Sequence, residues 1–198
     1  MKLRRLGLLT WATIAMVVLD AATSPALLVA YHLSPDLYDL HAYTDFGAMR
    51  SDMAILLWTF LTMLVFGWWI LRAGSNLAAL GFTELEYTPL ARIWWFFVPF
   101  ANLVIPYHGM RELWNASHGK LDLGANPPLV LLWWSLWLFS NFGLIILGVS
   151  AGPFELMTIV WIQSVTSIAL AAAVIPMLLG IARAQAAQRG PGLTDVFA

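Results

Sequence analysis

Long apolar windows separated by short polar stretches dominate this chain. A transmembrane helix needs about 20 predominantly apolar residues, a length that few helices of soluble cores reach without a charge. The windows predict four transmembrane helices, over residues 6–31, 53–72, 129–149 and 154–182. Because the polar stretches between them are short and contain no repeat, we interpret residues 1–198 as a single all-α integral membrane domain.

The first window is interrupted twice. Ser24 followed by Pro25 is typical of an N-cap and the first helical position, so we expect this span to be kinked or broken there. Asp20 lies about 21 Å from Leu6 if the helix is continuous, and nearer the outer interface if it breaks. Both placements remain open. A carboxylate at membrane depth is costly and by default marks a proton relay or a specific partner, which makes Asp20 a candidate site residue.

A further apolar stretch, WWFFVPFANLVIPYHGMRELW, covers residues 94–114. Thr88 and Pro89 predict a helix start just before it, so the whole segment extends over about residues 89–118. Its apolar part, Trp94 to Tyr107, would make about 21 Å of helix, against a hydrocarbon core of about 30 Å. That length is too short to cross the bilayer comfortably.

The distribution of basic residues favours a segment that returns to the side from which it entered. In that topology, with a cytoplasmic N-terminus, Arg50 alone lies outside. The other nine basic residues then lie in the cytoplasm, namely Lys2, Arg4, Arg5, Arg72, Arg92, Arg111, Lys120, Arg183 and Arg189. If the segment crossed, the count would be five against five. Because cytoplasmic loops carry the excess of Lys and Arg, we expect four spans with both termini cytoplasmic.

Within the segment 89–118, two prolines predict a break at membrane depth. Pro99 and Pro106 lack the backbone donor, so they free the carbonyls of Trp95 and Asn102, which must then face protein, water or ligand rather than lipid. We therefore expect a re-entrant or tilted half-helix broken by these prolines. A polar stripe begins after Pro106, and it predicts an amphipathic interfacial helix. The stripe comprises His108, Arg111, Glu112, Asn115 and His118.

Composition supports the membrane class and excludes several others. Of the 198 residues, 61% are hydrophobic and only 11% are charged, against about 25% in an average soluble domain. A net charge of -1 without a basic patch gives no reason to expect nucleic acid as a partner. The absence of cysteine excludes thiolate metal sites and thiol catalysis.

Two stretches of the sequence are similar to a known family. WWILRAGSNLAALG and WWFFVPFANLVIPYHGMRELW resemble a family of small multi-pass bacterial membrane domains catalogued only as a domain of unknown function. The matching residues are Arg72, Asn76 and Gly81, then Trp95, Phe96, Pro99, Asn102 and Pro106, with one extra residue between Phe96 and Pro99. The resemblance covers most of the chain after about Trp58 but not the first window. It implies a protein of the bacterial cytoplasmic (inner) membrane, and it implies no reaction.

His108 and Glu112 form the most suggestive pair of chemical groups in the sequence. They are four residues apart on one helix face and flank Arg111, so an imidazole and a carboxylate could share a proton. A zinc or di-iron site needs three or more ligands, and we predict no metal site. An ordinary pair on a solvated cytoplasmic face is the simpler interpretation.

These observations favour a non-enzymatic membrane protein over an enzyme. We expect an accessory or assembly subunit that binds membrane lipids, a lipophilic cofactor of unknown identity, or a larger membrane protein complex. The predicted binding surface combines Arg72, Asn76, Pro99, Asn102, Pro106, His108, Arg111 and Glu112. Two alternatives remain, a small carrier or channel with Asp20 as its ionisable group, and an interfacial enzyme that acts on lipid head groups through His108 and Glu112.

Overall fold

The computed structural model describes residues 5–34, 45–82, 84–120, 122–149 and 153–188, and these residues form helices and turns without a strand. The long helices are α1 (Gly7–Leu33), α3 (Asp45–Ala79), α6 (Pro128–Leu138) with its continuation α7 (Leu144–Val149), and α8 (Pro153–Ala187). Four stretches are long and apolar enough to cross a membrane, Gly7–Ala30, Met53–Ala79, Pro128–Leu147 and Thr158–Ala187. The expected all-α membrane fold with four candidate spans is confirmed.

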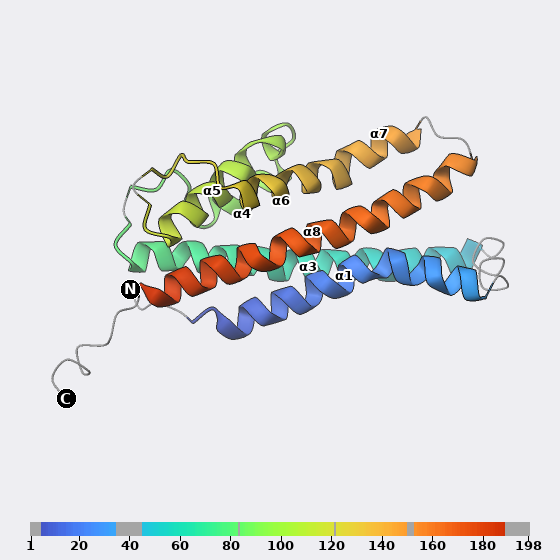
Figure 1. Cartoon of the computed structure of the whole chain (residues 1–198), viewed down its shortest axis with the longest axis horizontal. Helices are drawn as coiled ribbons and strands as arrows, with labels where there is room; N and C mark the ends of the chain where they lie inside the picture. Colours follow the sequence, from blue (N-terminus) through green and yellow to red (C-terminus); the bar gives the residue numbers. More distant parts are fainter. Residues whose placement is uncertain (1–4, 35–44, 83, 121, 150–152, 189–198) are drawn as a thin grey trace.

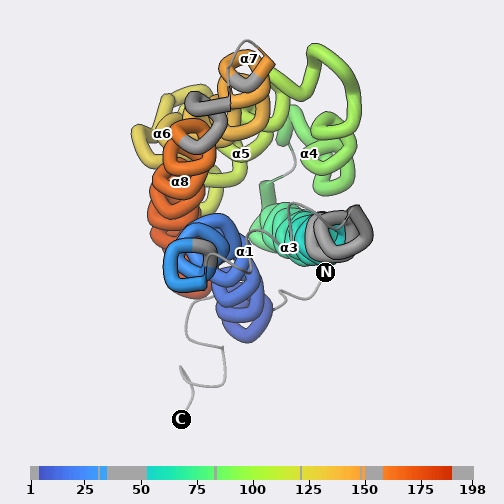
Figure 2. The backbone as a smooth tube through the Cα atoms, turned by 90° about the vertical axis from the view of Figure 1, so that its right-hand side faces the viewer, coloured from blue at the N-terminus to red at the C-terminus, as the bar shows by residue number. Residues whose placement is uncertain are grey.

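The long helices lie side by side along the longest axis of the molecule (Figure 1). α1 packs against both α8 and α3, and α6 packs against α8. Viewed along this axis, the four helices surround a shared interior (Figure 2). The start of α1, the end of α3 and the end of α8 lie at one end of the bundle, which we call the N-terminal end.

The outer surface of the bundle is apolar, the reverse of a soluble protein. Leu56, Leu57, Phe60 and Leu64 of α3 are each about half exposed or more. In a soluble monomer such a continuous apolar face would be a liability, whereas lipid tails solvate it well. Polar side chains lie inside instead, as where Trp69 Nε1 donates a hydrogen bond of 2.9 Å to the buried Thr10 hydroxyl.

A break at Pro25 was wrong, because α1 continues through this residue without interruption, and a kink there stays a prediction. Proline removes one backbone donor, but α1 as a whole packs against both α3 and α8, and this packing offsets the loss. The irregular span is the third one, where a π-helical turn, η3 (Phe139–Gly143), separates α6 from α7. Asn141 Nδ2 donates to the carbonyl of Trp137 in that turn, at 2.9 Å. There is no proline in η3, so the sequence pattern did not predict this irregular turn.

The segment between α3 and α6 is broken into short pieces, as expected. It consists of α4 (Ala91–Trp94), the 3₁₀ turns η1 (Trp95–Phe97) and η2 (Ala101–Leu103), and α5 (Ile105–Ser117). Phe100, at the bend between the two turns, has a positive φ of 61°. None of these pieces is among the candidate spans. The segment packs beside the N-terminal end of the bundle, where α3 ends and α6 begins (Figure 1).

Candidate functional site

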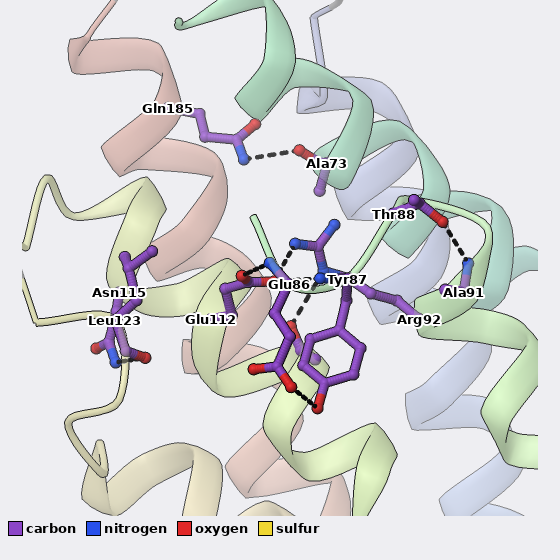
Figure 3. A network of polar contacts seen from close by, with 11 residues as sticks. Ala73, Glu86, Tyr87, Thr88, Ala91, Arg92, Glu112, Asn115, Leu123 and Gln185 are labelled. Atoms are coloured by element: carbon purple, nitrogen blue, oxygen red, sulfur yellow. Dashed lines mark hydrogen bonds and ion pairs between the residues drawn. The ribbon is translucent and has the colours of Figure 1, made fainter. Parts of the chain in front are cut away.

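A buried ion pair joins the two halves of the broken segment (Figure 3). Arg92 of α4 is 1% exposed, and its Nη2 lies 2.7 Å from Glu112 Oε2 of α5. Glu112 also accepts hydrogen bonds from the backbone N–H groups of Glu86 and Tyr87, at 2.6 and 3.2 Å. A carboxylate with three such donors is well compensated for its burial. The pair therefore fixes the loop after α3, α4 and α5 as one unit.

Two glycines make room for the Arg92 side chain. A Cβ on Gly74 of α3 would lie 2.9 Å from Arg92 Nη1, and one on Gly109 of α5 would lie 3.1 Å from Arg92 Cγ. Arg92 Nε donates to the carbonyl of Gly109 at 3.2 Å. Burial lowers the pKa of Arg92, and the negative charge of Glu112 opposes that shift. Among the described residues, Glu112 is the counter-ion of this buried guanidinium.

Gln185 ties α8 to the same region. Its Nε2 donates to the carbonyl of Ala73 at 3.0 Å and to Ser117 Oγ at 2.9 Å, and its Oε1 accepts from Asn76 Nδ2 at 3.0 Å. Gln185 is 1% exposed, so these bonds replace all of its water contacts. One amide thus connects α3, α5 and α8 at the N-terminal end of the bundle.

The expected polar stripe on α5 is not a solvated face. Glu112 and Asn115 are buried, and Asn115 Nδ2 donates to the carbonyls of Leu123 and Ala125. The prediction of a solvated face was wrong because other segments cover these side chains. Their hydrogen-bond partners lie in α4, in the loop before α4 and in the loop after α5, whose positions helical periodicity does not predict. His118 is exposed and stacks on Trp114, with ring centroids 4.2 Å apart.

His108 and Glu112 do not form the proton-sharing pair that their spacing suggested. Among the described residues, the hydrogen bonds of Glu112 go to Arg92 and to the two backbone N–H groups. Burial, and secondarily the charge of Arg111, lowers the pKa of His108. Arg111 turns away to Asn126, with Nη1 3.0 Å from Oδ1. The stripe is therefore divided among separate sets of contacts, since Glu112, Asn115, His118 and Arg111 each have different partners.

The remaining residues of the expected binding surface lie in different environments. Asn76 belongs to the Gln185 network, and Arg72 has a buried Nε without a partner among the described residues. Pro99 is exposed at the bend, while Pro106 is buried at the start of α5. The structure does not gather these residues with His108 into one open surface.

The backbone at the break bonds to α6 through the carbonyl of Leu103, and the expected freeing of the Trp95 and Asn102 carbonyls stays a prediction. Trp134 Nε1 of α6 donates to the carbonyl of Leu103, next to Asn102, at 3.1 Å. Asn102 itself donates from its backbone N–H to Val98 at 2.9 Å. The broken backbone is thereby attached to α6.

A cavity of about 530 Å³ lies among the candidate spans. It is lined by α1, α3, α4, η1, α6, η3 and α8, so α4 and η1 of the broken segment close part of it. Its aromatic lining consists of Phe66, Phe96, Phe97, Trp133 and Trp137, and its polar lining of Asp20, Thr23, Ser24, Thr59, Thr62, Ser140, Asn141, Gln163 and Ser167. Ligand pockets in proteins typically have about 300–1,000 Å³ and a mainly apolar lining with a few polar groups.

Asp20 is the only ionisable residue among those that line the cavity. Because α1 is continuous, Asp20 lies well inside the first span rather than at a break. Thr59 of α3 donates its hydroxyl to Asp20 Oδ1 at 2.7 Å, which fixes the carboxylate. Among the described residues, no group of three His, Asp or Glu side chains suits a metal ion.

Sequence reasoning missed Arg92, Gln185, Thr59 and Gln163 as site residues. Arg92 was counted only as a topological charge, although an arginine between apolar residues and near prolines is itself a signal of a buried partner. Gln163 lies in an apolar span, and nothing in that span indicated that its side chain lines a cavity with η3.

Comparison with known proteins adds a family and no activity. A family model described as a domain of unknown function (DUF4328) matches residues 37–186, which is more than half of the chain. The match begins before Trp58, where the resemblance was expected to start, and it leaves the whole of α1 uncovered. No curated protein and no solved structure matches the chain.

Proposed function

The chain belongs to the domain family of unknown function DUF4328, and from its own geometry we propose that it is a non-enzymatic membrane module that binds a lipophilic molecule between its spans. The cavity beside Asp20 is the observation that carries this proposal. As an accessory or assembly subunit, the protein would hold a lipid or a lipophilic cofactor for a larger membrane complex.

The cavity has the access that such a ligand needs. Met63 of α3 and Phe97 of η1 both line it, and they are 54% and 67% exposed on the apolar surface. A molecule dissolved in the bilayer can therefore approach between α3 and the tip of the broken segment without crossing water. Most of the described residues belong to the four candidate spans, so there is no large aqueous domain among them that could hold a catalytic site.

We further propose that the protein lies in the bacterial cytoplasmic membrane with both termini in the cytoplasm. The N-terminal end of the bundle, which contains Arg92 and Arg111, would then face the cytoplasm, in line with the bias of basic residues. Lys2, Arg4 and Arg189, which add to this bias, lie outside the described residues. In this orientation the segment from α4 to α5 enters from the cytoplasmic side and returns to it.

Native mass spectrometry after purification in mild detergent tests the binding function. We expect a bound lipophilic molecule that is lost in Ala171→Phe, because Ala171 is 7% exposed and lines the cavity. Ala172→Phe is the matched control, since Ala172 is exposed on α8 and does not line the cavity. A protein that carries no molecule and no stoichiometric partner would contradict the proposal.

A small carrier is the second candidate, and the position of Asp20 favours it. An ionisable group in a cavity between spans is where transporters bind coupling ions, and η1 would serve as the gate. Reconstituted protein should then show solute flux driven by a proton gradient, and Asp20→Asn should abolish it. Absence of flux for every ion and solute tested would exclude this role.

The interfacial enzyme is less well supported than either. Its supposed acid, Glu112, is 5% exposed and is already engaged by Arg92 and two backbone donors. A general acid or base needs a lone pair or a proton within reach of substrate. His108→Ala should therefore leave the cellular phenotype intact.

A further inference from the structure

We propose that the cavity takes a lipophilic cation, with its positive head against the Asp20 carboxylate and its apolar body among the aromatic side chains. This inference rests on the proposed binding function and adds the chemical class of the ligand. A protonated long-chain amine or an onium ion with apolar substituents belongs to this class.

The first argument is charge. Asp20 is the one ionisable side chain in the lining, and among the described residues the only ion pair is that of Arg92 with Glu112. A carboxylate away from bulk water is costly unless a cation or hydrogen-bond donors compensate it. The Thr59 hydroxyl supplies one donor, to Oδ1. A positively charged ligand would supply the rest.

The second argument is the direction of the hydrogen bonds around Asp20. The Thr59 hydroxyl donates to Asp20 Oδ1, and the Thr23 hydroxyl donates to the Asp20 carbonyl, each at 2.7 Å. Each of these two hydroxyls has a single proton, which is used in these bonds, so toward a ligand each hydroxyl oxygen can only accept a hydrogen bond. Pro25 also leaves the carbonyl of Ala21, a lining residue, without its usual helical donor. Asp20, Thr23, Thr59 and the Ala21 carbonyl therefore present acceptors here, and acceptors select a donor or a cation.

The polar groups from α8 and η3 reinforce that selection. Gln163 Nε2 donates to Ser140 Oγ at 3.3 Å and to Ser167 Oγ at 3.1 Å, which uses both of its amide protons. The Ser167 hydroxyl in turn donates to the carbonyl of Gln163, at 2.9 Å. Gln163 Oε1 is thus another acceptor available to a ligand. An anion placed beside Asp20 and Gln163 would meet a carboxylate and the acceptors described above.

The aromatic lining suits the body of a cation. Phe66, Phe96, Trp133 and Trp137 line the space, and the face of an aromatic ring attracts a nearby cation in addition to packing against apolar groups. Phe96 and Trp137 meet edge to face, with centroids 5.8 Å apart, so the two rings are held in a fixed relation. A small inorganic ion would leave most of the 530 Å³ empty, whereas a lipophilic cation fills it.

Equilibrium dialysis of the purified full-length chain in mild detergent tests the inference. The ligands are tetraphenylphosphonium, a lipophilic cation, and tetraphenylborate, an anion of matched shape. We expect saturable binding of one tetraphenylphosphonium per chain, without competition by tetraphenylborate. Asp20→Asn should weaken that binding by about tenfold or more, because it removes a desolvated charge pair. Asp122→Asn, a change at an exposed loop position, should leave it unaltered.

The outcomes separate this inference from the function on which it rests. If both ions bind with equal affinity, and Ala171→Phe blocks both while Asp20→Asn blocks neither, the cavity binds lipophiles without selecting charge and the inference fails alone. If neither ion binds, and native mass spectrometry also finds no ligand, both fail. Equal thermal stability of Asp20→Asn and the unaltered chain ensures that lost binding is not lost folding.

Discussion

Replacement of Glu112 by glutamine should destabilise the protein strongly, although the two side chains have almost the same shape. In the structure Glu112 neutralises Arg92, which is 1% exposed and lies 2.7 Å away. Glu112→Gln leaves the guanidinium buried with no counter-ion within reach among the described residues. Burial already lowers the pKa of Arg92, and the charge and hydrogen bond of Glu112 oppose that effect.

The size of the loss follows from the contacts. Breaking a buried ion pair by removing one partner costs about 3–5 kcal/mol, and the glutamine carbonyl retains one backbone hydrogen bond, so we expect about 3 kcal/mol. For a chain of this length, that free energy corresponds to a fall in Tm of about 6–12 °C. The double variant Arg92→Met with Glu112→Gln removes the unpaired charge and should recover more than half of the loss.

Thermal unfolding in detergent, followed by tryptophan fluorescence, measures these shifts. Glu86→Gln is the control, because the Glu86 side chain is exposed and only its backbone N–H bonds to Glu112. We expect the Tm of this variant to lie within about 2 °C of the unaltered chain. If Glu112→Gln behaved like Glu86→Gln, the ion pair would not hold α4 and α5 together and the described network would be incorrect.

Three further perturbations test the same end of the bundle in the same assay. Gly74→Ala places a methyl group 2.9 Å from Arg92 Nη1 and should cost about 1–3 kcal/mol, while Gly7→Ala, which meets nothing within 4 Å, should cost nothing. Gln185→Leu removes three buried hydrogen bonds and should cost about 2–4 kcal/mol; an unchanged Tm would argue against the network. Because burial lowers the pKa of His108, its contribution to stability is complete above about pH 6.5 and is lost as the pH falls toward the lower folded value. His108→Gln should therefore flatten the decrease of Tm between pH 7 and pH 5, and an equally steep decrease would contradict the assignment.

The number and order of the spans followed from the sequence because lipid imposes them. A bilayer demands long uninterrupted apolar helices, and α3 and α8 are of this kind. The break around Pro99 was also predictable, since proline acts through its own missing donor. The effect of Pro25 was not, because whether a helix tolerates a proline depends on the packing of its neighbours.

The candidate site was less accessible to sequence reasoning than the fold. Asp20 was identified from the sequence because the free-energy cost of a carboxylate in an apolar window depends on the residue itself and not on its neighbours. Its partner Thr59 is 39 positions away, and only the packing of α1 against α3 brings the two together. Periodicity likewise assigned Glu112 to a solvated face, because the burial of a helix face depends on which loops cover it.

The most direct test of the account is the topology of the segment between α3 and α6. The chain has no cysteine, so single cysteines can replace Lys120, which is exposed after α5, and Val149, which is 85% exposed at the end of α7. In intact cells, an impermeant maleimide should label Val149→Cys, and it should label Lys120→Cys only after the membrane is opened. Labelling of Lys120→Cys in intact cells, with Val149→Cys protected, would mean that the segment crosses the membrane and would contradict the four-span account.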